Sequence, residues 1–148
     1  KMLPYVEKVE HLMKQMRIFL ACADERLKMA MLMLLDRQPE MVVAGITDRF
    51  NNVPAQVEAS QPDVLVMVCE KPLASIAEQI TNVHNLPCPP VIIYLSNRTA
   101  EKETIKAAGA DYFILKNSPP DELISILNNL NVSETNKPNH NSFNAAID

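Results

Sequence analysis

Short apolar runs alternate with longer segments of helical periodicity along the middle of the chain. Because these runs are rich in branched residues and contain little polar alternation, they predict strands buried on both faces, as in a parallel sheet. The runs are residues 17–22, 41–47, 63–69, 91–95 and 112–115.

The segments between the runs begin with residues that favour helix starts. Five strands alternating with five helices predict a doubly wound α/β domain. The expected helix starts are Asp24 before 25–37, Asn52 before Val53 and Pro54, Ser75 in a capping box with Glu78, Thr99 before 100–108, and Ser118 before a first-turn Pro119.

The two ends of the chain differ from this core. Apolar residues at helical spacing within residues 1–16 predict an N-terminal helical extension, with a leader segment as the alternative. Residues 17–130 form the expected domain. From residue 131 the sequence turns to Asn, Ser, Thr and Pro, which predicts a linker or disordered tail over 131–148.

Length, charge and hydropathy exclude several classes of function. The 148 residues suit one domain, and a net charge of −4 argues against direct binding of nucleic acid. The longest apolar run, residues 29–35, is too short to cross a membrane, and no signal-peptide pattern opens the chain, so we expect a cytoplasmic protein. Two glycines exclude a glycine-rich phosphate loop, and three cysteines without paired spacing argue against zinc or a disulfide framework.

Ligands of open α/β sheets bind outside the carboxyl ends of the strands, where strand order reverses. The residues to consider are therefore those that end the first and third predicted strands. They are Cys22, Ala23 and Asp24 after the first, and Val68, Cys69 and Glu70 after the third.

Several segments in this order resemble the receiver domains of bacterial response regulators, in particular the NarL/LuxR-type branch. They are RIFLA at 17–21, PEMVVAG at 39–45, QPDVLVMV at 61–68, Pro72, and AAGADYFILKNSPPDEL at 107–123. The resemblance covers about residues 17–130. It implies a flavodoxin-like (βα)5 three-layer sandwich whose five-stranded parallel sheet has the order 2-1-3-4-5.

Receivers carry an acidic pair that holds Mg²⁺ and an aspartate that accepts a phosphoryl group. Carried over by the resemblance, the acidic pair falls on Cys22 and Ala23, and the phospho-acceptor falls on Val68. These side chains offer neither hard oxygen ligands for Mg²⁺ nor a nucleophilic oxygen. The resemblance also places the family's lysine at Lys116, its hydroxyl residue at Ser96 and its switch aromatic at Phe113.

We therefore expect a degenerate receiver, a pseudo-receiver without catalytic residues, metal or cofactor. It would act independently of phosphorylation, through a protein partner or a homodimer, as the regulatory module of a transcription regulator. In a longer protein of this branch, a DNA-binding output domain would follow Asp148. Two alternatives remain: a phosphorylatable receiver that uses Mg²⁺ with the displaced acids Asp24, Glu25 and Glu70, or a flavodoxin-like domain that binds a small ligand.

Several of these residues also have a purely structural interpretation. Asp24 is expected to cap a helix rather than to bind a metal. Lys116 either signals or is simply solvated. Cys22 and Cys69 end adjacent strands and either pack as buried thiols or form an oxidant-sensing pair.

The first predicted helix has more apolar residues than a core face needs. Leu27, Met31, Leu34 and Leu35 suffice for the core, so a second stripe is expected to face solvent. That stripe is a candidate interface, either for a second subunit or for the chain's own leading segment. It comprises Met29, Leu32 and Met33, and the leading segment would contribute Val6, Val9 and Met13.

Overall fold

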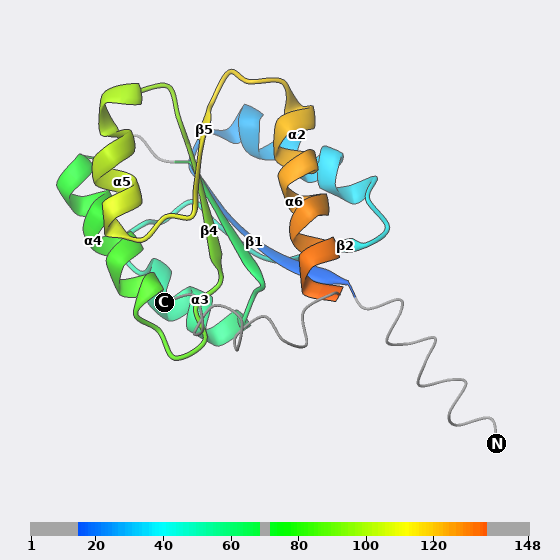
Figure 1. The fold of residues 1–148 in the computed structure, drawn as a ribbon, viewed down its shortest axis with the longest axis horizontal. Coiled ribbons are helices and arrows are strands. Elements are labelled where there is room, and N and C mark those ends of the chain that lie inside the picture. The colour runs from blue at the N-terminus through cyan, green and yellow to red at the C-terminus, as the bar shows by residue number, and fades with distance from the viewer. Residues whose placement is uncertain (1–14, 69–71, 136–148) are drawn as a thin grey trace. The chain divides into compact units, whose positions relative to one another are not determined.

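The structure, a computed structural model, describes residues 15–68 and 72–135. The chain divides into two compact units, residues 1–117 and residues 118–148. The first unit holds a five-stranded parallel sheet of order β2-β1-β3-β4-β5, which confirms the predicted fold class (Figure 1). Its strands are β1 (Met16–Cys22), β2 (Met41–Thr47), β3 (Val64–Val68), β4 (Val91–Ser96) and β5 (Tyr112–Leu115).

Helices cover both faces of this sheet. Helix α2 (Glu25–Asp36) contacts β1 and β2 on one face. The opposite face carries α3 (Val53–Ser60), α4 (Leu73–His84), and a short 3₁₀ turn, η1 (Thr99–Glu101), that leads into α5 (Lys102–Ala108) (Figure 1). Helix α6 (Pro120–Thr135) belongs to the second unit.

Alternation along each strand divides the core between the two faces of the sheet. Phe19 and Ala21 of β1 belong to the cluster beneath α3, α4 and α5, whereas the alternate residues Ile18, Leu20 and Cys22 are buried on the opposite face of the sheet. Strand β3 is buried along its whole length, as expected for a strand covered on both sides. The larger cluster is completed by Leu65, Met67, Ile76, Ile80, Val83, Ile92 and Tyr94, among others.

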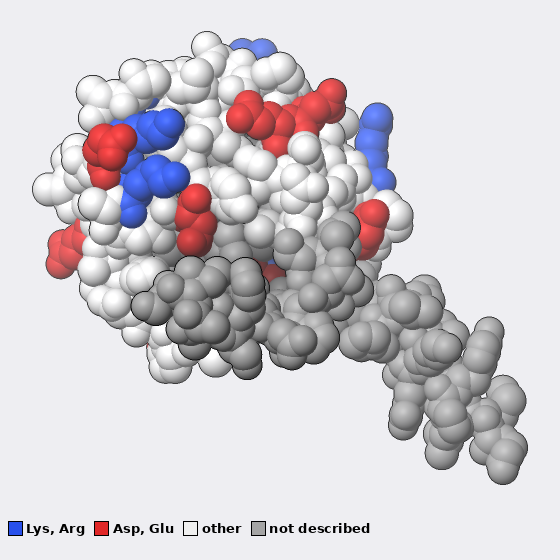
Figure 2. All heavy atoms as spheres, viewed as in Figure 1, with Lys and Arg blue, Asp and Glu red and all other residues white. Residues whose placement is uncertain are grey.

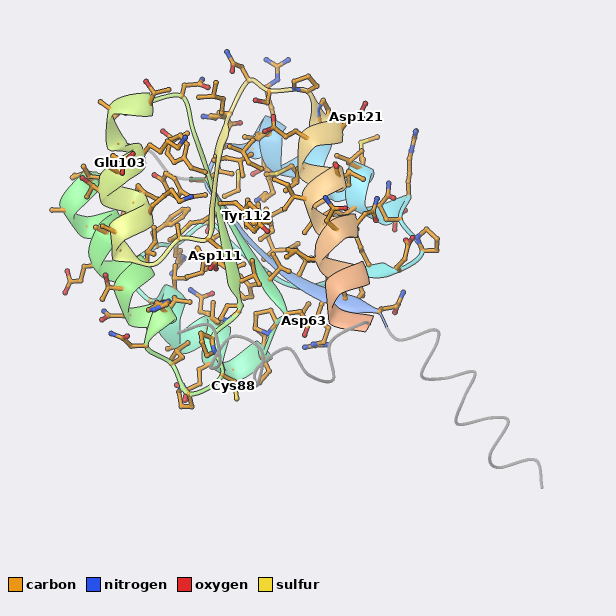
Figure 3. The ribbon with its side chains drawn as sticks, in the orientation of Figure 1. Asp63, Cys88, Glu103, Asp111, Tyr112 and Asp121 are labelled. Carbon is orange, nitrogen blue, oxygen red and sulfur yellow. The ribbon has the colours of Figure 1, made fainter. Side chains whose placement is uncertain are left out.

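Two aspartates fix the strands at the amino edge of the sheet (Figure 3). Asp63 donates its backbone N–H to the Arg17 carbonyl and accepts the Arg17 N–H on its carboxylate, both at 2.8 Å. Asp111 makes the same reciprocal pair with Ile92, also at 2.8 Å. Because each aspartate comes directly before its strand, the pairs lock β3 onto β1 and β5 onto β4 in register.

Several expected helix boundaries are wrong. Helix α4 begins at Leu73 rather than after Ser75, because Pro72 has extended dihedrals and its carbonyl accepts the first helical N–H, and because Leu73 packs on the core. Thr99 lies inside η1 instead of capping a helix. Helix α6 starts at Pro120, one residue later than expected, and continues to residue 135, into the expected tail. Propagation adds a hydrogen bond for each residue at little cost, and no Gly or Pro interrupts the segment before Pro138.

Gly109 ends α5 in a conformation that other residues rarely adopt. Its φ is +130°, and a Cβ atom there would lie 2.8 Å from Cβ of His84. Glycine at this position therefore allows α5 and α4 to approach each other closely.

Candidate functional site

The carboxyl edge of the sheet brings together the residues that the sequence singled out. Cys22 ends β1 and is paired in register with Val68, the last residue of β3. Both are buried, with exposed fractions of 0% and 3%. The thiol and the isopropyl group thus stand side by side where the resemblance places an acid and the phospho-acceptor, while Ala23 is exposed just beyond the strand.

The hydrogen bond and the pKa of the Cys22 thiol are those of a buried structural group. It donates to the Asp24 carbonyl at 3.4 Å, and burial raises the pKa of the thiol. A raised pKa keeps the sulfur protonated at neutral pH, in the form that is poorest as a nucleophile and as a metal ligand. Cys69, which with Cys22 would form the alternative oxidant-sensing pair, lies outside the described residues.

Ser96 ends β4 at the same edge, one residue beyond the run that predicted this strand. Its hydroxyl oxygen accepts the Arg98 N–H at 2.9 Å, and its carbonyl accepts the Lys116 N–H at 3.1 Å. A third bond, from the Asn117 N–H to Oδ1 of Asn97 at 3.1 Å, ties the two loops together. The structure therefore places Ser96 and Lys116 on adjacent strand ends, while their roles in signalling stay a prediction.

Asp24 has two structural roles at this edge. Its Oδ1 accepts the Leu27 N–H at 3.1 Å, so the expected helix cap is confirmed. Its Oδ2 lies 3.9 Å from Nζ of Lys116, which forms an ion pair that the sequence did not reveal. The Leu27 N–H, and to a smaller extent the Lys116 ammonium, hold the pKa of this carboxyl below its ordinary value.

The described side chains at this edge do not form a donor set that fits Mg²⁺. Over residues 15–68 and 72–135, no group of three or more His, Cys, Asp or Glu side chains is placed to hold a metal ion. Of the displaced acids, Asp24 caps α2 and Glu25 pairs with Lys28 at 3.1 Å, while Glu70 is outside the described residues. Magnesium needs several oxygen ligands in octahedral geometry, which a thiol, a methyl and an isopropyl group cannot provide.

Phe113, at the expected switch-aromatic position, is half-buried in β5. Its ring centroid lies 6.1 Å from that of Tyr94, with the two rings tilted by 37°. The ring therefore packs on the edge of the core beneath α4 and α5. The structure shows one position of this ring, so its role as a switch stays a prediction.

The exposed stripe predicted on the first helix is largely present. Met29 and Met33 of α2 are 49% and 62% exposed, while Leu32 is half-buried. Met31 and Leu35 are buried as predicted, whereas Leu27 and Leu34 are only half-buried. The residues expected to pair with this stripe, Val6, Val9 and Met13, lie outside the described residues.

The surface charge gives no sign of a nucleic-acid site on the side that Figure 2 presents. Acidic and basic side chains lie next to one another there and form no broad basic area. In the described part of the chain, no helix has the length and hydropathy needed to cross a membrane.

No family model matches the sequence, and a search of curated proteins also gave no match. Solved structures do match. The signal receiver domain of a response regulator, NarL, from Mycobacterium tuberculosis has a TM-score of 0.70 at 18% identity over 79% of this chain and 96% of its own. A DNA-binding response regulator of the LuxR family from Staphylococcus aureus has a TM-score of 0.69 at 19% identity, over 78% of this chain and 98% of that one.

A third similar structure is the receiver domain of the sensor histidine kinase PA1611 from Pseudomonas aeruginosa, with magnesium coordinated in its active-site cleft. Its TM-score is 0.66 at 17% identity, over 76% of this chain and 94% of that one. At such identities the likeness establishes the fold. The chain has the receiver-domain fold.

Proposed function

We propose that this chain is a pseudo-receiver, a signalling domain with the receiver scaffold that does not accept a phosphoryl group. The observation that carries the proposal is the pairing of Cys22 with Val68 at the carboxyl edge of the sheet. Phosphoryl transfer needs a nucleophilic oxygen and a metal-bound acceptor site, and these two buried side chains offer no oxygen.

The other positions that the resemblance singles out still hold residues of the expected types. Lys116 and Ser96 occupy adjacent strand ends, and Phe113 packs beside Tyr94. A domain of this kind would signal through protein contacts, as the regulatory module of a response regulator or transcription regulator. Any switch would depend on a partner that binds one conformation more tightly than the other, because a ligand shifts an equilibrium only by its differential affinity.

Phosphorylation from a small-molecule donor tests the proposal. The protein is incubated with acetyl phosphate and Mg²⁺, and its intact mass is measured beside a receiver domain that has a complete acid set. We expect the control to gain one phosphoryl group and this protein to stay unmodified. A phosphoryl adduct on this protein that hydroxylamine removes, as it does acyl phosphates, would overturn the proposal.

The ion pair between Asp24 and Lys116 is the one observation that favours the rival function, a receiver that uses displaced acids. The variants Asp24→Asn and Glu25→Gln separate the two functions, because each removes one of these carboxylates at a similar side-chain size. An adduct on the wild-type protein that either variant loses would show that the removed carboxylate takes part, as the acceptor or as a ligand of Mg²⁺, and peptide mapping of the adduct would tell the two apart. If the wild-type protein stays unmodified, helix capping is enough to explain the position of Asp24.

A further inference from the structure

Large apolar side chains are exposed on the side of the molecule formed by α2 and β2. Five large apolar side chains in the described residues are exposed, and three of them lie on this side. Met29 and Met33 are one helical turn apart on α2, and we call this pair the α2 surface. Ile46 of β2, 45% exposed, is paired in register with Leu20, so it lies on the sheet face that carries α2.

The chain enters β1 beside the carboxyl end of α2. Nε2 of Gln15 donates to the Pro39 carbonyl at 3.1 Å, and the Met16 N–H donates to the Glu40 carbonyl at 2.7 Å. Pro39 and Glu40 belong to the loop that joins the end of α2 to β2. These bonds hold the end of the leading segment next to the helix that carries the α2 surface.

We propose that residues 1–14 cover the α2 surface of the same chain. Their sequence places Val6, Val9 and Met13 at helical spacing i, i+3 and i+7, which would form one apolar stripe. As a helix, 14 residues would be about 21 Å long, against about 18 Å for the 12 residues of α2. A helix that ends at Gln15 would run parallel to α2, because both would end at the amino edge of the sheet.

A tethered segment suits this surface better than a second copy of the chain. A stable protein–protein interface buries roughly 800 Å² on each partner, far more than a few exposed side chains provide. A segment already attached beside α2 acts at an effective concentration in the millimolar range, so a small apolar contact is enough to hold it. Any partner of the α2 surface would have to displace residues 1–14.

Methionine oxidation measures directly whether residues 1–14 cover the α2 surface. Hydrogen peroxide converts exposed methionines to the sulfoxide, and peptide mapping by mass spectrometry gives the initial rates for Met29 and Met33. Met31, on the same helix and 5% exposed, serves as the internal reference for a buried methionine. We compare the full chain with a form that lacks residues 1–14. If the segment is bound four-fifths of the time, its removal speeds oxidation of Met29 and Met33 about fivefold.

A matched pair of full-length variants keeps the test independent of the deletion. Val9→Asp puts a charge into the apolar stripe, whereas His11→Asp puts the same charge on the opposite side of the expected helix. We expect Val9→Asp to speed oxidation as the deletion does, and His11→Asp to leave it unchanged.

Equal rates in the full chain, the deletion form and Val9→Asp would overturn the proposal. Protection that persists without residues 1–14 and grows with protein concentration would do so too, in favour of a second copy. Because the oxidation assay involves no phosphoryl donor, its outcome is independent of the test of the proposed function.

Discussion

The reactivity of Cys22 is the sharpest check on the interpretation of the carboxyl edge. Iodoacetamide alkylates the thiolate of a cysteine that the reagent can reach. The structure offers a matched comparison within one molecule: Cys22 is fully buried with a raised pKa, whereas Cys88 is exposed and lies near the amino edge, before β4 (Figure 3). We expect Cys88 to be alkylated rapidly and Cys22 to be protected.

The expected protection follows from the cost of exposing the end of β1. Local opening free energies range from near zero at frayed ends to the global value, and a buried central strand belongs in the upper part of that range. An opening cost of about 3 kcal/mol already makes the reactive population smaller by about a hundredfold, since each 1.4 kcal/mol is a factor of ten. Burial also raises the Cys22 pKa, which slows the reaction further.

Peptide mapping after timed alkylation gives separate rates for the cysteines. A reaction in denaturant, where both thiols should react at similar rates, serves as the control. If Cys22 reacts within about threefold of Cys88 in the native protein, the buried structural thiol inferred here is wrong. The carboxyl edge would then be open to solvent, and an oxidant-sensing role for Cys22 would need to be reconsidered.

Three further predictions concern stability, each measured by urea denaturation. Gly109→Ala should lower the free energy of unfolding by about 2 kcal/mol, because φ is +130° and the new Cβ meets His84; an unchanged value would contradict the strain. Asp111→Ala should cost about 1–3 kcal/mol by leaving the buried N–H of Ile92 without its acceptor, while Glu103→Ala, at an exposed position of α5, changes the free energy by less than about 0.5 kcal/mol. For Asp24 the folded-state pKa is lowered from 3.8, so its stabilisation is present above that value and is lost as pH falls through the folded pKa. The stability difference between the wild type and Asp24→Asn should therefore be constant near neutral pH and shrink below about pH 4, and a difference that persists unchanged in acid would refute this.

The strands and the place of the site could be predicted because both depend on local pattern. An apolar run without alternation is stable only where both faces are covered, so five runs predict a central sheet. Parallel strands bring their carboxyl ends to one edge, and the meeting of Cys22 with Val68 then follows from their positions as strand ends. The cap at Asp24 was predictable for the same reason, since capping involves residues three apart.

The features that sequence reasoning missed depend on distant or competing contacts. The ion pair of Asp24 with Lys116 joins the loop after the first strand to the end of the last, and no local spacing reveals it. Ser75 and Glu78 have the spacing of a capping box. Leu73 packs against the core, however, and the helix therefore begins at Leu73, before Ser75. Here the free energy of core packing outweighs the preference for a side-chain cap.

The reciprocal bonds of Asp63 and Asp111 place the anchors of strand register at the amino edge, away from the candidate site. Side chains at the carboxyl edge can therefore change without loosening the alignment of the sheet. For protein design, this makes the domain a host into which acids at positions 22, 23 and 68 could be grafted one at a time. Such a series would separate the requirements for binding a metal from those for accepting a phosphoryl group on a single scaffold.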